Sequence, residues 1–388
     1  MLTLIQNATL YSPDFMGEKD VLVAGGKFVA IEDNIDISSL KNIHIAVVDG
    51  TGLKLMPGII DPHVHIAGAG GEGGPKTRTG EMPLRDLLEG GVTTVIGCLG
   101  TDGITRDVRS VLMKAKSIRE EGLSAWMYTG SYQVPPPSIT GDYAKDVALI
   151  EEVIGVGEIA LSDHRSSTPT TSELIKLVEH TRVAGMLAGK AGIVNIHMGD
   201  AKNPFQPIID AVNNSQLPFK QFYPTHCNRN AEIFEDAKAY GKKGYVDLTS
   251  SSYPFFPDEE VKPSKAIKLL LDAGVPIEHI TMSSDANGSL PQFDKDGKLV
   301  KLERGKPIAN LIEVTDAIRE EKLPAETAIR TVTSSVADIL KLHSKGYVHN
   351  GYDADCILLD DEYRIKYLFA NGVLMVDDYE VIKKSAFE

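Results

Sequence analysis

Two histidines in a short apolar segment are the residues of this sequence that most strongly indicate chemistry. His63 and His65 follow the run Met56-Pro57-Gly58-Ile59-Ile60, whose Pro-Gly break and apolar residues predict a buried strand entered from a turn. Because side chains two positions apart on a strand point to the same face, the two imidazoles share one side. Two neutral imidazoles on one face, at the end of a buried strand, make a good pair of metal ligands.

Three further residues of ligand type follow later strand candidates. His197 and His226 end the fifth and sixth apolar segments, and Asp285 ends the eighth. Each alone is ordinary, a core histidine or a helix-capping aspartate, but their shared position at strand ends makes coincidence a poor explanation. Imidazole together with carboxylate suits zinc and similar divalent metals. Five other histidines lie away from strand ends and are expected to have ordinary structural roles: His44, His180, His279, His343 and His349.

The elements that must position these residues are strands alternating with helices. Eight apolar strand candidates end at His65, Gly100, Tyr132, Asp163, Asp200, His226, Ser250 and Asp285. Apolar residues three and four apart predict helices between them, as at 107–120, 172–184 and 264–271. This alternation favours an α/β fold with a closed, TIM-like (β/α)8 barrel, whose functional residues lie at the C-terminal ends of the strands. An open doubly wound sheet is the alternative, although no Gly-x-Gly-x-x-Gly follows the first strand.

Both ends of the chain have the composition of short strands. The candidates are 2–5, 20–24 and 27–31 at the start, and 353–359, 365–369 and 372–376 at the end. Gly25-Gly26 predicts a hairpin between two of them. We expect both ends to pair into one small β-sandwich domain. The predicted division is 1–55 and 341–388 for the two parts of this domain, and 56–340 for the barrel.

A polar stretch after the eighth strand, residues 291–304, predicts a hairpin with Lys295-Asp296-Gly297-Lys298 at its centre. Glycines at 68, 70, 71, 73 and 74 would allow the loop 68–80 to close over a site.

Composition narrows the class of protein. The chain has 388 residues, 42% of them hydrophobic, and a net charge of −14, with nothing that resembles a basic stripe for nucleic acid. Cys98, Cys227 and Cys356 are odd in number and far apart, so no disulfide framework is expected. Neither a signal peptide nor a membrane span is predicted, and the cytoplasm is the expected location.

Several motifs together resemble a known superfamily. The start Pro57-Gly58-Ile59-Ile60-Asp61-Pro62-His63-Val64-His65, the histidines of strands five and six and the aspartate of strand eight resemble the amidohydrolases. Within them, the chain resembles the β-aspartyl (isoaspartyl) dipeptidases over nearly its whole length. The segments that carry this second resemblance are Gly70-Gly71-Glu72-Gly73-Gly74-Pro75, Leu99-Gly100-Thr101-Asp102, Gly130-Ser131-Tyr132-Gln133-Val134-Pro135, Ser162-Asp163-His164-Arg165-Ser166, His197-Met198-Gly199-Asp200, Pro224-Thr225-His226-Cys227-Asn228-Arg229-Asn230 and Ser283-Ser284-Asp285-Ala286-Asn287-Gly288-Ser289.

One position departs from the family pattern. The family usually bridges two metals with a carboxylated lysine at the end of strand four, and the matching residue here is Glu158. A glutamate also presents a two-oxygen anionic bridge, although its side chain is shorter. The other interpretation is an ordinary paired acid beside a single metal. We favour the bridge, because a charged residue ending a buried strand is costly unless it is paired or bound to metal.

The resemblance implies two divalent ions, with zinc as the expected metal, and hydrolysis by a hydroxide that bridges them. One ion is expected on His63, His65 and Asp285, and the other on His197 and His226, with Glu158 between them. Asp285 is expected to accept the proton of the nucleophile and pass it to the leaving amine.

The expected substrate, a β-aspartyl dipeptide, carries one ammonium and two carboxylates. Glu72 is placed for the ammonium, and Arg165 and Arg229 are placed for the carboxylates, which arginine pairs bidentately. Tyr132 is expected to stabilise the oxyanion. Thr101 and Ser289 are expected to form secondary hydrogen bonds.

Two other functions stay open on this scaffold. One is hydrolysis of an N-acyl amino acid or a cyclic amide, whose substrate has no ammonium for Glu72 to bind. The other is a non-catalytic assembly protein like the dihydropyrimidinase relatives, which would be expected to have lost ligands. The resemblance further implies a homo-oligomer, an octamer, with no nucleic-acid or membrane partner.

Overall fold

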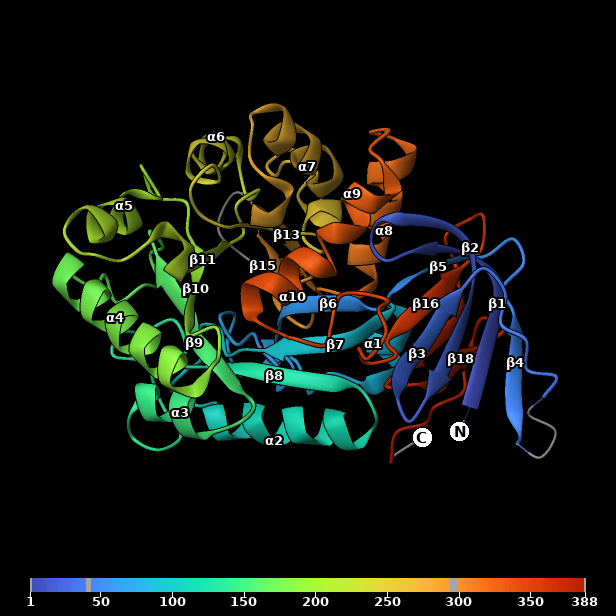
Figure 1. Cartoon of the computed structure of the whole chain (residues 1–388). Helices are drawn as coiled ribbons and strands as arrows, with labels where there is room; N and C mark the ends of the chain where they lie inside the picture. The colour runs from blue at the N-terminus through green and yellow to red at the C-terminus, as the bar shows by residue number, and fades with distance from the viewer. Residues whose placement is uncertain (1, 40–42, 294–298, 387–388) are drawn as a thin grey trace.

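The computed structural model describes residues 2–39, 43–293 and 299–386. Strands from both ends of the chain form one mixed sheet, blue and red at the right of Figure 1. In these ranges its strands are β1 (Leu2–Tyr11), β2 (Phe15–Ala24), β3 (Lys27–Glu32), β4 (Ile45–Asp49), β5 (Lys54–Pro57), β16 (Cys356–Leu359), β17 (Ile365–Ala370), β18 (Val373–Asp377) and β19 (Glu380–Val381). Their order is β19-β18-β17-β16-β5-β1-β2-β3, with β4 paired to β1. A domain of strands from both termini is therefore confirmed, and hydrogen bonding joins these strands into a single sheet.

The sheet passes directly into the second part of the molecule. β5 pairs with β16, with Pro57 opposite Cys356, and β6 (Ile59–Val64) starts two residues later. The apolar run from Met56 is thus two strands that belong to different sheets. Gly58 separates them, and only glycine fits there, because a Cβ would lie 2.2 Å from the Thr93 hydroxyl oxygen.

Eight parallel strands make up the second part. They are β6, β7 (Val92–Gly97), β8 (Ser124–Thr129), β9 (Val153–Leu161), β10 (Ile193–Met198), β11 (Phe222–Thr225), β12 (Val246–Thr249) and β13 (Ile280–Ser283). Among the described residues, β6 to β11 form one sheet in sequential order and β12 and β13 form another. Every residue of these eight strands is buried except one position of β8, as expected for strands covered on both faces.

Hydrogen bonds connect the two parallel sheets on both sides. The Cys227 amide donates to the Asp247 carbonyl at 3.1 Å, next to β11 and β12, and the His65 amide donates to the Ala286 carbonyl at 3.0 Å, next to β6 and β13. The arrangement is barrel-like, although strand pairing is not continuous around all eight strands in the part of the chain described. The sequential order is not that of a doubly wound sheet, whose strand order reverses at a switch point.

Helices cover the outside of the parallel strands (Figure 1). They are α1 (Leu84–Glu89), α2 (Val108–Glu120), α3 (Tyr143–Leu149), α4 (Thr171–Ala188), α5 (Gln206–Asn213), α6 (Ala231–Tyr240), α7 (Pro263–Asp272), α8 (Ile308–Arg319), α9 (Ala325–Arg330) and α10 (Ser334–Leu340). The predicted helices at 107–120, 172–184 and 264–271 correspond to α2, α4 and α7. Local sequence sets their starts: the Asp107 carboxylate caps α2, and Thr170 and Glu173 form a capping box on α4.

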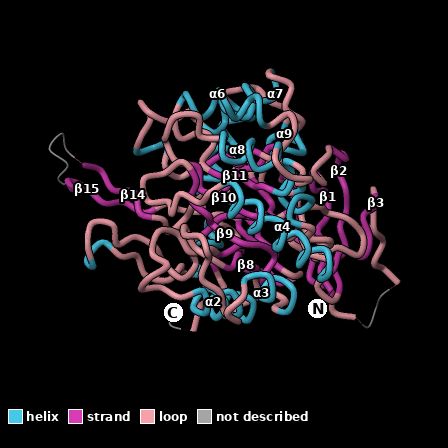
Figure 2. The backbone as a smooth tube through the Cα atoms, turned by 90° about the vertical axis from the view of Figure 1, so that its left-hand side faces the viewer, coloured by secondary structure: helices cyan, strands magenta, loops and turns pink. Residues whose placement is uncertain are grey.

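An antiparallel hairpin of β14 (Ser289–Phe293) and β15 (Leu299–Arg304) follows β13 and projects from the body in Figure 2. Its arms confirm the predicted hairpin, and the predicted centre at 295–298 lies outside the described residues. None of the helices in the described ranges is both long and apolar enough to cross a membrane.

Candidate metal-dependent active site

The predicted metal ligands converge at the C-terminal ends of the parallel strands. They are His63 in β6 and His65 just after it, Glu158 in β9, His197 in β10, His226 just after β11, and Asp285 just after β13. These residues lie as many as 222 positions apart in the sequence. The barrel-like arrangement of the parallel strands brings them together at one end of those strands.

Glu158 lies at the centre of the four imidazoles. Its Oε2 is 3.5 Å from His63 Nε2, 3.2 Å from His197 Nδ1 and 3.6 Å from His226 Nε2. Its Oε1 is 3.6 Å from His65 Nε2. Only 1% of the residue is exposed. One buried carboxylate therefore faces both histidine pairs, as a residue shared by two metal positions would.

The side chains fit divalent metal. Two groups have ligand atoms within 4.8 Å of one another, and they share Glu158: one with His63, His65 and Cys98, the other with His197 and His226. Asp285 Oδ1 is buried and lacks a hydrogen-bond partner among the described residues, although it lies 3.0 Å from His65 Nε2. A buried acceptor without a donor is rare in proteins, and a bound cation would satisfy it.

Two of the predicted ligands have a strained backbone conformation. His226 has φ = 62° and Asp285 has φ = 52°, in the left-handed region that residues with a side chain seldom adopt. Such a conformation costs of order 1 kcal/mol or more, and it is typical of functional sites.

Neighbouring polar groups orient two of the imidazoles. His63 Nδ1 lies 3.1 Å from Asn195 Oδ1, and His226 Nδ1 lies 2.7 Å from Thr249 Oγ1. These contacts leave Nε2 of each ring to face Glu158, the arrangement expected of metal-binding histidines. The sequence prediction did not include Asn195 or Thr249. Asn195 precedes His197 by two positions on β10 and so shares its face, which is the signal available for it.

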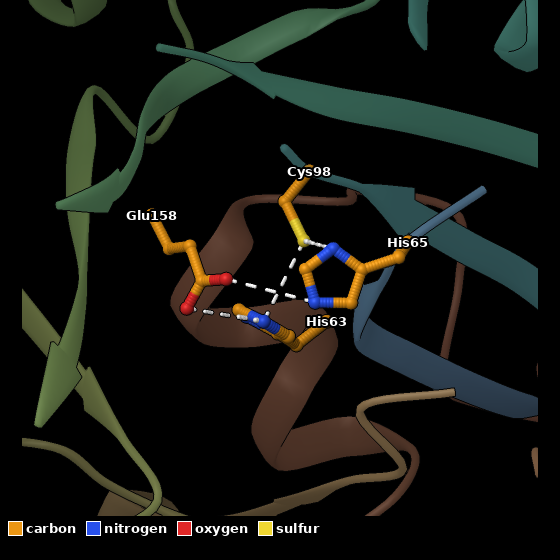
Figure 3. Close-up of side chains that lie close together, drawn as sticks. All are labelled: His63, His65, Cys98 and Glu158. Carbon is orange, nitrogen blue, oxygen red and sulfur yellow. Dashed lines mark hydrogen bonds and ion pairs between the residues drawn. The ribbon is translucent and has the colours of Figure 1, made fainter. Parts of the chain in front are cut away.

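Cys98 is a further side chain at this centre that the prediction missed. It directly follows β7, and Figure 3 shows its sulfur pointing toward both rings of the first histidine pair. Its Sγ lies 3.5 Å from His63 Nε2 and 3.7 Å from His65 Nδ1. Burial raises the pKa of the thiol, but the neighbouring His63 and His65 outweigh burial and lower it overall. Its position at a strand end is the signal that also led to the predicted metal ligands.

A cavity of about 510 Å³ opens beside the cluster and collects every residue predicted to bind substrate. The residues predicted from the sequence that line it are Glu72, Thr101, Tyr132, Arg165, Arg229 and Ser289. Glu72 Oε1 is 3.8 Å from Arg165 Nη1, and the Ser289 hydroxyl donates to Glu72 Oε2 at 3.1 Å. Acidic and basic groups thus share one cavity with the histidine cluster.

Asp163, also absent from the predicted set, holds Arg165 in place. Its Oδ1 accepts from Arg165 Nε at 2.9 Å and its Oδ2 accepts from Nη2 at 2.8 Å. The same Oδ2 lies 3.0 Å from His197 Nε2. This carboxylate therefore fixes both the predicted carboxylate-binding arginine and one of the predicted metal ligands.

Tyr132 joins the cavity to the cluster. Its hydroxyl lies 2.9 Å from His197 Nδ1, and the Arg165 guanidinium lies 5.2 Å from the ring centroid. Burial, and then the charge of Glu158, raise the pKa of Tyr132 well above its ordinary value. The phenol therefore keeps its proton at neutral pH and is a hydrogen-bond donor.

The pKa values of two acids of the site are shifted in opposite directions. Burial acts to raise the pKa of Glu158, but the surrounding histidines outweigh it and hold the pKa well below the ordinary range. Glu260, another residue that lines the cavity and was not predicted, has its pKa raised to about 7 by burial. Glu158 is thus held as an anion, whereas Glu260 titrates near neutrality.

Comparisons with known proteins identify the family of this chain. The chain is 40% identical to a β-aspartyl dipeptidase from Fervidobacterium islandicum AW-1, solved in complex with β-Asp-Leu, with 100% of both chains covered and a TM-score of 0.91. A dihydroorotase from Lactobacillus johnsonii is 21% identical over 94% of this chain and 90% of its own length. A dihydroorotase from Elusimicrobium minutum is 28% identical, and that match spans 54% of this chain and 48% of the relative. The amidohydrolase family profile matches residues 55–382, and the chain belongs to the amidohydrolase family.

Proposed function

We propose that this chain hydrolyses β-aspartyl dipeptides in a metal-dependent reaction. The observation that carries the proposal is that Glu72, Arg165 and Arg229 line one cavity beside the histidine cluster, with Glu72 Oε1 3.8 Å from Arg165 Nη1. A β-aspartyl dipeptide has one ammonium and two carboxylates around its scissile amide, and these are the groups that Glu72 and the two arginines would bind. The similarity to the Fervidobacterium enzyme supports the same choice.

The proposed centre holds two divalent ions, with zinc as the expected metal. His63, His65 and Asp285 would hold one, His197 and His226 the other, and Glu158 would contact both. When bound, the ions activate a water molecule and polarise the amide carbonyl.

The chain supplies proton transfer and charge stabilisation. Asp285 accepts the proton of the attacking water and passes it to the nitrogen of the leaving amine. The Tyr132 hydroxyl donates a hydrogen bond to the carbonyl oxygen as negative charge develops on it. Because the pKa of Tyr132 is raised, this donor stays protonated throughout the neutral range.

Substrate binding divides among the remaining cavity residues. Glu72 binds the ammonium group, and Arg165 and Arg229 bind the carboxylates. Thr101 and Ser289 add hydrogen bonds to the substrate. The Thr101 hydroxyl oxygen lies 3.5 Å from Arg165 Nη1, and the Ser289 hydroxyl donates to Glu72 Oε2. Asp163 positions Arg165 for its role.

A second candidate is the hydrolysis of a cyclic amide, because the relatives from Lactobacillus johnsonii and Elusimicrobium minutum are dihydroorotases. Dihydroorotate carries a carboxylate but no ammonium group. Glu72 would then face no positive group on the substrate, so this residue separates the two functions.

The test compares purified protein on β-Asp-Leu, α-Asp-Leu, N-acetylaspartate and dihydroorotate. We expect hydrolysis of β-Asp-Leu that stops when the metal is removed by a chelator and returns when zinc is added. Hydrolysis of dihydroorotate or N-acetylaspartate without hydrolysis of β-Asp-Leu would replace the proposal with the corresponding alternative.

A variant pair isolates the role of Glu72. Glu72→Gln is expected to raise KM for β-Asp-Leu at least tenfold, because an ion pair with the ammonium is lost. Glu81→Gln is the matched control, since Glu81 is an exposed acid that pairs with Lys114 at 3.6 Å. An unchanged KM in Glu72→Gln would remove Glu72 from substrate binding.

A further inference from the structure

Cys98 lies beside His63 and His65, the histidine pair expected to bind the first of the two metal ions. It is fully buried, and its Sγ lies within 3.7 Å of a nitrogen of both His63 and His65. With Glu158 these residues offer four ligand atoms within 4.8 Å of one another, and their side chains converge in Figure 3. The thiol has a weak protein partner, the Val64 carbonyl oxygen at 3.6 Å.

We propose that Cys98 binds the metal centre as a thiolate, on the side of His63 and His65. The inference rests on the proposed metal-dependent function and adds a sulfur ligand to its imidazoles and carboxylates. Thiolate is a strong ligand for zinc and cobalt, and imidazole and thiolate commonly occur together in zinc sites.

Charge balance supports the thiolate. Two divalent ions would carry four positive charges, and Glu158, Asp285 and the expected hydroxide would supply three negative charges in a buried site. Uncompensated charge is costly away from water, and a thiolate at Cys98 would supply the fourth negative charge. A neutral thiol at the same position would contribute none.

The backbone around Cys98 is built for close approach. Gly97 precedes it, and a Cβ there would lie 2.4 Å from Ile66 Cδ1. Gly100 follows it, and a Cβ there would lie 2.8 Å from His65 Cε1 and 3.0 Å from Glu158 Oε1. Without a side chain at Gly97 the strand end can pack against Ile66, and without one at Gly100 the following loop can lie against His65 and Glu158.

The other two cysteines have different surroundings. The Cys227 thiol donates to the Pro224 carbonyl oxygen at 3.4 Å, and Cys356 packs in the apolar core of the terminal sheet. Both are buried and free, as Cys98 is. Cys356 therefore serves as a matched control that is remote from the histidines.

Cobalt reports the bond directly. Metal-free wild type, Cys98→Ser, Cys98→Ala and Cys356→Ala are titrated with Co²⁺, and absorption is recorded from the near ultraviolet through the visible. We expect a near-ultraviolet thiolate-to-cobalt charge-transfer band in wild type and in Cys356→Ala. Both Cys98 variants are expected to lack the band and to bind Co²⁺ more weakly by at least about tenfold.

The spectrum separates this inference from the proposed function. A wild type that binds cobalt without the band, or a Cys98→Ala that keeps it, overturns the thiolate ligand even if β-Asp-Leu is hydrolysed. A wild type that shows the band but fails to hydrolyse β-Asp-Leu overturns the function and leaves the ligand standing. The wild-type spectrum is decisive on its own if the Cys98 variants do not fold, which circular dichroism checks.

Discussion

Tyr132 is held between His197 and Arg165, with a hydroxyl that stays protonated at neutral pH. If this hydroxyl contacts the substrate oxygen only once charge develops there, Tyr132→Phe lowers kcat with little change in KM. The expected loss in kcat is about a hundredfold, the usual size for one oxyanion donor. Steady-state kinetics on β-Asp-Leu measures both constants. A variant that raises KM alone would show that Tyr132 binds substrate and does not stabilise the transition state.

The titration of Glu260 lowers the free energy of unfolding as pH rises. Its pKa in the folded chain is about 7, above the ordinary 4.5, because burial disfavours the ionised form. The folded state therefore binds this proton more tightly than the unfolded state does. The contribution to stability is present below about pH 4.5 and is lost as pH rises through 7.

Glu260→Gln removes this titration. In metal-free protein the variant is expected to match wild type near pH 4 and to exceed its unfolding free energy by about 3 kcal/mol at pH 8. Urea unfolding at a series of pH values measures the difference, with the neighbouring exposed acid Glu259, as Glu259→Gln, for control. A difference that is the same at every pH would mean that Glu260 does not titrate near 7.

At the scale of elements, Asp247 of β12 connects the two parallel sheets. Its carboxylate accepts from the Thr225 hydroxyl of β11 at 2.6 Å and from the Thr281 and Ser283 hydroxyls of β13 at 2.7 and 2.5 Å. The residue is 1% exposed, so water cannot replace a lost partner. The bond to Thr225 joins β11 to β12, between which the described structure has no strand pairing, whereas those to Thr281 and Ser283 lie within the paired strands β12 and β13.

Asp247→Ala is therefore expected to destabilise the fold by about 3 kcal/mol, since it leaves three buried hydroxyls without their acceptor. Asp361→Ala is the control, because Asp361 is a 91% exposed acid whose ion pair with Lys54 is expected to contribute less than about 1 kcal/mol. Urea unfolding of the metal-free proteins measures both. Equal effects of the two substitutions would mean that the hydrogen bonds of the Asp247 carboxylate do not stabilise the fold.

At the scale of the whole molecule, local patterns predicted most elements. The eight parallel strands, the helices α2, α4 and α7 and the arms of the β14–β15 hairpin follow from apolar spacing, which the chain carries within each segment. Among the described strands, β4, β5 and β19 escaped this reasoning. β4 is partly exposed, β19 is two residues long, and β5 reads as one apolar run with β6 because only Gly58 separates them.

The sequence predicts those residues of the candidate site that are of metal-ligand type and also lie at the end of a strand. His63, His65, His197, His226 and Asp285 meet both criteria. Asp163 and Thr249 act through partners such as Arg165 and His226, and such partnerships depend on the tertiary fold. Cys98 does occupy a strand end, but a buried cysteine is common in protein cores, so its residue type alone does not indicate a ligand. The predicted domain division and the homo-oligomer stay predictions.

The carboxylate of Glu158 is part of the translated chain, and this bears on how the proposed centre assembles. A lysine at the same position would carry a bridging anion only after its amine had reacted with carbon dioxide to form a carbamate. Glu158 needs no such reaction.

Metal-free protein is therefore expected to recover full activity with zinc in buffer stripped of carbon dioxide, with no gain from bicarbonate. Any activity of Glu158→Lys, by contrast, should require bicarbonate. A bicarbonate requirement in the wild type would contradict a bridge by Glu158. With Glu158 as the bridging residue, the proposed centre would assemble from chain and metal independently of the dissolved carbon dioxide around it.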